Sequence, residues 1–138
     1  MEIYTRKVHY YETDQMQIVH HSNYIRWFEE ARTNLMDDIG FSYKRMEDEG
    51  IVIPVLGVNV EYKTMSRFGE TVEIEATVKE FTGVKLLVNY VVRDKKTQDI
   101  RVVGETKHAF LNKQTYRPVS LKRKHKELYE LFKNMITE

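Results

Sequence analysis

The chain has 138 residues, a formal net charge of +1 and no cysteine. This length suits one domain, which we expect to span residues 1–138, and the missing cysteines exclude disulfide bonds and thiolate metal sites. The near-zero net charge argues against a general nucleic-acid-binding protein, because such proteins are usually strongly basic. Hydrophobic residues make up 41% of the chain, which is enough for a core, so disorder is not indicated.

The sequence predicts neither a membrane span nor a signal peptide. No apolar run is long enough for a transmembrane helix, and the first residues carry no apolar signal-peptide core. A chain without cysteine is also compatible with a reducing compartment. We therefore expect a cytoplasmic protein.

The first half of the chain predicts a strand, an irregular segment and a long helix. The strand is expected over residues 3–11, and the segment after it holds Asp14 and two adjacent histidines. Ser22 or Asn23 is placed to cap a helix over residues 24–39. The apolar stripe of this helix is formed at helical spacing by Ile25, Phe28, Leu35, Met36 and Ile39.

Trp27 lies off the centre of that stripe, and we expect it on a second contact surface rather than in the middle of the core.

The second half of the chain predicts mainly strands. A short helix or turn over residues 41–49 precedes them, and a closing helix is expected over residues 120–135. Pro54 and Gly57 interrupt the first of these strands, which indicates a bulge or an edge position there. The strand over 84–93 is apolar on both faces and is expected to be central. The four strands are predicted over residues 51–62, 71–81, 84–93 and 100–111.

One strand, one helix, four strands and a closing helix predict an antiparallel α+β domain. A single helix on about five strands leaves the edges of the sheet exposed, and such edges are usually paired or covered. We therefore expect a homodimer in which strands meet edge to edge.

The order of Asp14 and the following helix indicates carbonyl chemistry. The helix N-terminus offers unpaired N–H groups and the positive end of the helix dipole, which would stabilise a developing oxyanion. Asp14 would then be the base or the nucleophile that acts on the same carbonyl. From spacing alone, the simpler interpretation is that Asp14 is an Asx-turn residue of a loop.

Three motifs give the chain a family resemblance. The stretch YYETDQMQIVHHSNYIRWFEEAR resembles the signature of hotdog-fold acyl-CoA thioesterases of the 4-hydroxybenzoyl-CoA thioesterase type. The loop YKTMSRFGE is similar to a second motif of that family, and Gly104 to Phe110 followed by Arg117-Pro118 is similar to a third. The resemblance covers nearly the whole chain in the expected order. It departs from the family at Gln17, where glycine is usual.

The resemblance implies a hotdog fold, in which an antiparallel five-stranded sheet wraps around a long central helix, with a C-terminal helix. It implies hydrolysis of an acyl-CoA substrate to free acid and CoA without a metal or another cofactor. Homodimers or homotetramers are implied, with active sites at the subunit interface. The family's catalytic aspartate corresponds to Asp14 and an assisting histidine to His21. The implied substrate-binding positions are Gln17, His20, Ser22, Asn23, Tyr24 and Arg67.

Several alternatives stay open at this point. His21 suits a capping role as well as a catalytic one, and His20 suits packing or pocket lining better than chemistry. Two histidines with one carboxylate are poor evidence for a metal site. Arg67 is interpreted as a solvated arginine or as a contact to a CoA phosphate, whose geometry guanidinium matches. His108 is expected to be a core or interface histidine.

Two other functions compete with acyl-CoA hydrolysis. The first is a non-catalytic acyl-thioester-binding protein, in which Gln17 blocks productive geometry. The second is a thioesterase that acts on acyl carrier protein, which differs only in the thiol carrier and which fold analogy does not resolve.

Overall fold

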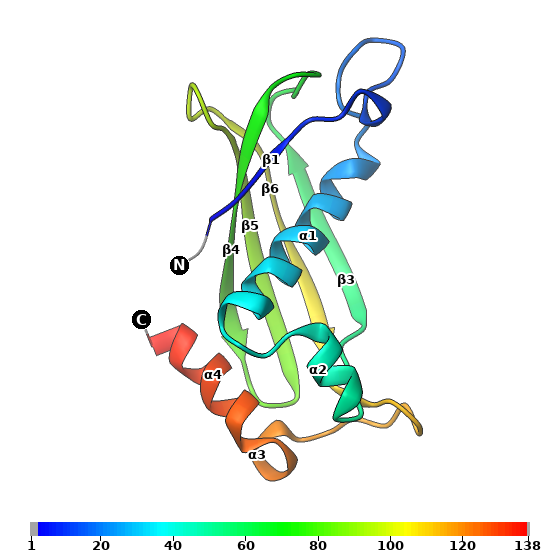
Figure 1. Ribbon diagram of the computed structural model, residues 1–138, viewed down its shortest axis with the longest axis vertical. Helices are drawn as coiled ribbons and strands as arrows, with labels where there is room; N and C mark the ends of the chain where they lie inside the picture. Colours follow the sequence, from blue (N-terminus) through cyan, green and yellow to red (C-terminus); the bar gives the residue numbers. More distant parts are fainter. Residues whose placement is uncertain (1–2, 138) are drawn as a thin grey trace. The chain divides into compact units, whose positions relative to one another are not determined.

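The computed structural model describes residues 3–137, which form strands and helices as an α+β protein (Figure 1). The five-stranded sheet has the order β1-β4-β5-β6-β3, and β2 pairs with β7 in a separate small sheet. The strands are β1 Ile3–Lys7, β2 Ile51–Val52, β3 Val55–Tyr62, β4 Thr71–Phe81, β5 Lys85–Asp94, β6 Ile100–Ala109 and β7 Leu111–Asn112. The helices are the 3₁₀ helix η1 Tyr10–Glu12 and the α-helices α1 Ser22–Asp38, α2 Tyr43–Asp48, α3 Leu121–Lys124 and α4 Lys126–Thr137.

The chain divides into two compact units, and several strands run through both. Unit 1 consists of Met1–Leu35, Val60–Ala76 and Tyr90–Gly104. Unit 2 consists of Met36–Asn59, Thr77–Asn89 and Glu105–Glu138. A single domain over residues 1–138 stays a prediction.

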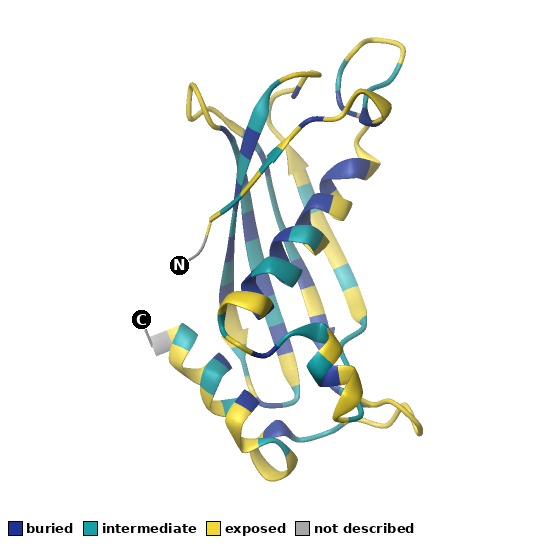
Figure 2. Ribbon diagram, viewed as in Figure 1, coloured by how far each residue is buried: buried dark blue, intermediate teal, exposed yellow. Residues whose placement is uncertain are grey.

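The middle strands form as their hydrophobic patterns predict. Along β4 every second side chain is buried, and the same alternation runs along β5 (Figure 2). Such alternation places one face of each strand on a core. The central position expected for the strand after Gly83 is confirmed, because β5 is the third of five strands. The buried side chains of β4 are Val72, Ile74, Ala76 and Val78.

The first strand is shorter than predicted. It ends at Lys7, and η1 replaces the residues that were expected to continue it. The side chain of Glu12 causes this turn, because its Oε1 accepts the N–H of His9 at 2.8 Å. The Glu12 N–H in turn donates to the His9 carbonyl at 3.0 Å. This reciprocal capping turns the chain into η1 instead of extending the strand.

Two other predicted strands are divided. The strand expected over residues 51–62 breaks at Pro54, which has no N–H to give to a ladder, and β3 begins at Val55. As the sequence predicted, β3 lies at an edge of the five-stranded sheet. The last predicted strand stops at Ala109, and its final part becomes β7, where Leu111 pairs with Val52.

The predicted stripe of α1 is confirmed at Phe28, Leu35 and Met36, which are buried, but not at Ile25. Ile25 is exposed, whereas Trp27 is completely buried, so the expectation of Trp27 on a second contact surface was wrong. Phe28, which was predicted correctly, stacks on Tyr90 of β5 with ring centroids 4.3 Å apart. The buried face of α1 is made by Tyr24, Trp27, Phe28, Ala31, Leu35 and Met36.

The predicted short helix is confirmed as α2, which Ser42 caps by accepting the Arg45 N–H. The closing helix is not continuous, because His125 has φ −140° and ψ 71° and separates α3 from α4. Buried apolar residues on both pieces, Leu121 and Leu128, still join the core of unit 2. His108, expected in a core or interface, is buried with Nε2 2.7 Å from the Thr106 hydroxyl oxygen.

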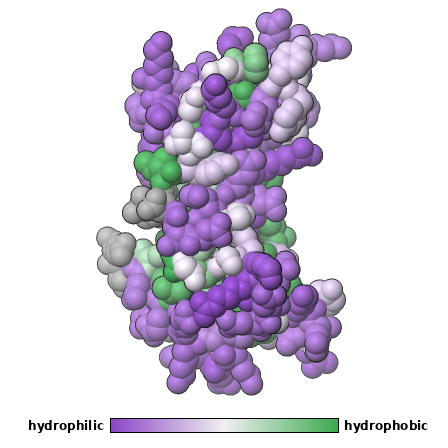
Figure 3. All heavy atoms as spheres, viewed as in Figure 1, coloured by the Kyte–Doolittle hydropathy of each residue, from purple (hydrophilic) through white to green (hydrophobic). Residues whose placement is uncertain are grey.

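Hydrophilic residues cover most of the face in view in Figure 3, with small groups of hydrophobic residues between them. None of the helices in the described part of the chain is long and apolar enough to cross a membrane.

Candidate active site

Asp14 begins a tight turn in unit 1. Its N–H donates to the Ile18 carbonyl and its own carbonyl accepts the Gln17 N–H, both at 2.9 Å. Its carboxylate oxygen Oδ1 accepts the Met16 N–H at 2.8 Å, as in an Asx turn. No hydrogen bond from any residue between 3 and 137 reaches the second oxygen, Oδ2. The turn therefore fixes the carboxylate through one oxygen and leaves the other available.

Gln17 closes the Asp14 turn with a left-handed backbone. Its φ is 64°, a conformation that glycine adopts freely and that other L-residues adopt at a cost of about 1–2 kcal/mol. This geometry gives a physical reason for the glycine that is usual at this position. Here the backbone keeps the left-handed path, and the glutamine side chain extends from it in an exposed position.

The Asp14 turn opens onto a cavity of about 390 Å³. Among the predicted site residues, Asp14, Gln17 and Arg67 line it together. Two aromatic side chains of the wall were not predicted as site residues. The complete lining is Tyr10, Thr13, Asp14, Gln17, Arg67 and Phe68.

Tyr10 and Phe68 meet edge to face across this cavity, with ring centroids 5.5 Å apart, and are 75% and 60% exposed. In the sequence, Tyr10 falls within the strand that was expected over residues 3–11. Phe68 stands next to Arg67 in the second motif, and this adjacency was the one available signal. Their pairing depends on a contact between distant parts of the chain, which local spacing does not encode.

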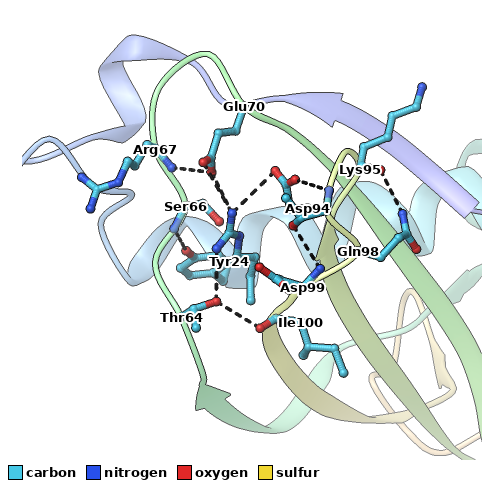
Figure 4. Close-up of polar contacts among 12 residues, drawn as sticks. Tyr24, Thr64, Ser66, Arg67, Glu70, Asp94, Lys95, Gln98, Asp99 and Ile100 are labelled. Atoms are coloured by element: carbon cyan, nitrogen blue, oxygen red, sulfur yellow. Dashed lines mark hydrogen bonds and ion pairs between the residues drawn. The ribbon is translucent and has the colours of Figure 1, made fainter.

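The loop between β3 and β4 holds the Asp14 turn in place. The Val19 N–H donates to the Ser66 carbonyl at 2.9 Å, and Ile18 forms a β-bridge with Arg67. The Arg67 N–H donates to Glu70 Oε1 at 2.9 Å, whereas the Arg67 guanidinium points away from this contact (Figure 4). The first and second sequence motifs therefore meet in one structural unit.

The start of α1 is capped differently from the prediction. Ser22 and Asn23 were expected as capping residues, but both lie inside the first turn of the helix. The cap comes from His20, whose Nδ1 accepts the Ser22 N–H at 3.2 Å and lies 2.8 Å from the Ser22 hydroxyl oxygen. The His20 carbonyl also accepts the Asn23 N–H at 3.0 Å. His20 thereby takes the role because its ring nitrogen lies within hydrogen-bond distance of the first residue of the helix.

His21 follows the cap and is exposed. Its ring stacks on His20 with centroids 4.2 Å apart and meets Tyr62 edge to face at 6.2 Å. Its carbonyl accepts the Tyr24 N–H at 3.4 Å. Within residues 3–137, no hydrogen-bond partner is found for the His21 N–H, so this group is the available donor at the start of α1.

Asn23 and Tyr24 are buried, with exposed fractions of 7% and 3%. The Asn23 side-chain amide donates to the Glu12 carbonyl at 2.9 Å. The Tyr24 hydroxyl accepts the Ser66 N–H at 3.3 Å, and burial raises the pKa of Tyr24 despite its hydrogen bonds to Ser66 (Figure 4). Both side chains hold the site together, while a direct contact of either with substrate stays a prediction.

The predicted site residues thus form three groups, one of which is the buried pair Asn23 and Tyr24. Asp14, Gln17 and Arg67 line the cavity, and the histidines with Ser22 form the start of α1 outside its lining. In residues 3–137 no cluster of three metal-ligating side chains is found.

Comparisons with known proteins show the family to which the chain belongs. A family model described as "Thioesterase-like superfamily" matches residues 8–130. The chain belongs to the thioesterase-like superfamily. It is 32% identical over 117 residues to a Bacillus subtilis protein named "Putative acyl-CoA thioesterase YneP", which covers 85% of this chain and 84% of that protein. It is 26% identical over 132 residues to an acyl-CoA thioesterase of Helicobacter pylori, covering 88% and 95% of the two chains.

Among solved structures of the superfamily, this chain resembles a DHNA-CoA thioesterase from Staphylococcus aureus. The TM-score is 0.91 at 30% sequence identity, and the match covers 96% of this chain and 88% of the other. The family resemblance and the hotdog fold predicted from the sequence are confirmed.

Proposed function

We propose that this thioesterase-like chain hydrolyses acyl-CoA thioesters to the free acid and CoA, with Asp14 as base or nucleophile. The family and the named relatives support acyl-CoA hydrolysis, as the sequence predicts. The observation that carries the role of Asp14 is its place in the wall of the cavity with Oδ2 unengaged by the described residues.

Two routes lead from this carboxylate to the same products. Asp14 either takes a proton from a water that attacks the thioester carbonyl, or attacks the carbonyl itself to form an anhydride that water then hydrolyses. In both routes the carbon–sulfur bond breaks, the acyl group gains OH from water, and the remaining proton goes to CoA. A thiol has a pKa of about 8.5, so the thiolate leaves without a strong general acid.

The start of α1 supplies the oxyanion site in this proposal. The His21 N–H is available and lies at the positive end of the helix dipole, where negative charge is favoured. The Ser22 and Asn23 N–H groups are already engaged by His20. His21 is therefore proposed to assist catalysis through its backbone and, through its exposed ring, by binding substrate.

Arg67 is proposed to bind a phosphate of CoA. Its backbone is fixed by Glu70 and by the β-bridge to Ile18, while its guanidinium is directed away from the acidic side chains in Figure 4. A planar guanidinium matches phosphate oxygens in pairs.

The active form is proposed to be a homo-oligomer built on the edge strand β3. This strand has eight residues and exposes Val55, Leu56 and Val58 by 45%, 59% and 42%. The unpaired backbone N–H and carbonyl groups of such an apolar edge strand favour pairing with a strand of another chain. A second copy of the same chain is the occupant we propose. A cytoplasmic location belongs to the same proposal, because the cysteine-free sequence is compatible with a reducing compartment.

The decisive experiment follows CoA release with a thiol reagent across acyl-CoAs from acetyl to palmitoyl and benzoyl derivatives. Wild type and Asp14→Asn run side by side, and the cysteine-free protein gives no background. We expect release by wild type and a loss of about 10²- to 10⁴-fold in the variant, the usual range for a general base. Retention of most activity by Asp14→Asn would exclude the assigned role.

Gln17 favours one alternative function, because its side chain lines the cavity in which glycine would leave space. A non-catalytic acyl-thioester-binding protein would be thermally stabilised by acyl-CoA without releasing CoA. A thioesterase for carrier-protein substrates would release thiol from acyl carrier protein and not from acyl-CoA.

A further inference from the structure

Glu12 is a buried carboxylate of unit 1. It is 4% exposed and receives three hydrogen bonds of 2.8 Å. Arg6 Nη1 and the His9 N–H donate to Oε1, and Trp27 Nε1 donates to Oε2. A charge with this many donors is fully compensated, which is the condition under which a buried carboxylate is tolerated.

The charges around Glu12 extend from β1 to α1. Arg6 also donates through Nε to Glu30 at 2.8 Å, and its guanidinium carbon lies 4.8 Å from the centre of the Trp27 ring. The Tyr4 hydroxyl donates to the same Glu30 oxygen at 2.9 Å. We call Arg6, Glu12 and Trp27 the Glu12 cluster, and Glu30 lies outside it because no hydrogen bond found in residues 3–137 joins it to Glu12.

The backbone of Glu12 holds the other side of the candidate site. Its carbonyl accepts the His20 N–H and the Asn23 side-chain amide, both at 2.9 Å. His20 is the residue that caps α1, and Asp14 follows Glu12 by two positions in the chain. One residue therefore ties β1, the start of the Asp14 turn and the start of α1 together.

We infer that Glu12 is a positioning residue for hydrolysis, whose carboxylate fixes the Asp14 turn relative to the first N–H groups of α1. The inference rests on the proposed function, because it assigns the purpose of the Glu12 cluster to the Asp14 chemistry. The Glu12 side chain is buried and does not line the cavity. It therefore acts by holding Asp14 and His20 in place rather than by touching the substrate. Misplacing reacting groups by about 1 Å costs about 10²-fold in rate.

The variant that tests this is Glu12→Gln, which keeps the shape of the side chain. Its amide has one acceptor oxygen and one NH₂ group, so in either orientation the NH₂ faces the Trp27 N–H or the donors of Arg6 and His9. Glu30→Gln is the matched control. It removes the other carboxylate bound to Arg6, but no hydrogen bond found in residues 3–137 joins Glu30 to the Asp14 turn.

Two readouts are needed, one of which does not depend on activity. The first is kcat and KM with the best acyl-CoA of the panel. The second is hydrogen–deuterium exchange of residues 13–21. For Glu12→Gln we expect kcat to fall about 10²-fold with KM changed less than about threefold, and exchange in 13–21 to rise at least about tenfold. For Glu30→Gln we expect both to stay close to wild type.

Equal effects of the two variants on kcat, or unchanged exchange of residues 13–21 in Glu12→Gln, would overturn the inference. A wild type that hydrolyses no member of the panel would refute the proposed function, and the exchange experiment would still test whether Glu12 fixes the turn. If Glu12→Gln does not fold, Trp27→Phe removes the donor to Glu12 Oε2 together with part of a buried ring. Trp27→Phe must then both lower kcat and increase exchange of residues 13–21. If either effect is absent, the inference is overturned.

Discussion

The hydroxyl of Tyr24, on the first turn of α1, accepts a hydrogen bond from the backbone N–H of Ser66 at 3.3 Å. Both residues are buried, and Ser66 precedes Arg67 in the loop that holds the Asp14 turn. This contact joins the helix of the first sequence motif to the loop of the second.

Tyr24→Phe should destabilise the chain. The change leaves the Ser66 N–H without its acceptor in a buried position, which costs about 1–3 kcal/mol. Urea unfolding measures the difference in free energy. Tyr62→Phe is the control, because the exposed Tyr62 hydroxyl makes only a 3.5 Å contact to the His21 carbonyl. Equal losses of unfolding free energy in both variants would show that the hydrogen bond to Ser66 does not stabilise the chain more than the exposed Tyr62 contact does.

The stabilising effect of Glu12 should depend on pH. Burial alone would raise the pKa of Glu12, but hydrogen bonds from Arg6, Trp27 and the His9 N–H outweigh it and hold the pKa below its ordinary value. A carboxylate with a lowered folded-state pKa contributes its full stability above the unfolded value of about 4.3 and loses it as pH falls through the folded value.

The free energy of unfolding of wild type should therefore exceed that of Glu12→Gln most at pH 7. Below about pH 4.3 the difference should shrink as Glu12 takes up a proton in the unfolded state and then in the folded one. Chemical denaturation of both proteins at a series of pH values measures this difference in the free energy of unfolding. The contributions of the other carboxylates cancel when the value for the variant is subtracted from that for wild type. A difference that stays constant from pH 7 down to acid unfolding contradicts the assignment.

Gln17→Gly should stabilise the Asp14 turn. Glycine relieves the left-handed backbone cost of about 1–2 kcal/mol, and its greater freedom in the unfolded chain returns about 0.5–1 kcal/mol of that gain. The expected net effect is about 0.5–1 kcal/mol, measured by denaturation. Gln17→Ala keeps the backbone cost and removes most of the side chain, so it should show no comparable gain.

The same pair of variants separates the two functions at issue. If Gln17 blocks productive geometry, both Gly and Ala should create or raise CoA release. Unchanged release in both variants would argue against the binding-protein account.

Leu56→Lys should disrupt the proposed homo-oligomer. A lysine on an edge strand places a charge where a second strand would pair, and natural sheets use this to protect their edges. Light scattering coupled to size exclusion should give a monomer mass at micromolar concentration, where wild type gives at least a dimer. Ile136→Lys, on the exposed side of α4, is the control and should keep the wild-type mass. A wild-type monomer would refute the proposal directly.

Arg67→Ala should raise KM for acyl-CoA about tenfold with little change in kcat. A hydrogen bond to a charged group contributes about 1.5–3 kcal/mol, and a contact made equally in ground and transition states affects KM alone. The effect should vanish with acyl-pantetheine substrates, which lack the nucleotide phosphates. An equal rise in KM for both substrate types would place Arg67 at the acyl end instead.

The sequence could predict what depends on local spacing. The alternation of Val72, Ile74 and Ala76 predicts a half-buried strand, and β4 has that pattern. Ser42 and Gly50 bound a short helix in the way their conformational preferences require. The family resemblance supplied Asp14, Gln17 and Arg67, which the structure brings to one cavity.

What the sequence could not predict depends on distant partners. Trp27 was misplaced because its burial is decided by an acceptor, Glu12, from another segment. Tyr10 and Phe68 meet only after both segments have folded. Ser22 or Asn23 was expected to cap α1 because these residue types cap helices often, whereas here the imidazole of His20 does so.

The left-handed backbone at residue 17 has a consequence for how this thioesterase can evolve. The path of the turn is set by backbone hydrogen bonds that join Asp14 to Gln17 and to Ile18. These bonds require no particular side chain at residue 17. A side chain that lines the cavity can therefore be exchanged by a single mutation at a conformational cost of about 1 kcal/mol, against a total stability of about 5–15 kcal/mol. In the proposed site, a change at residue 17 therefore alters the wall of the cavity while the hydrogen bonds that shape the Asp14 turn are kept.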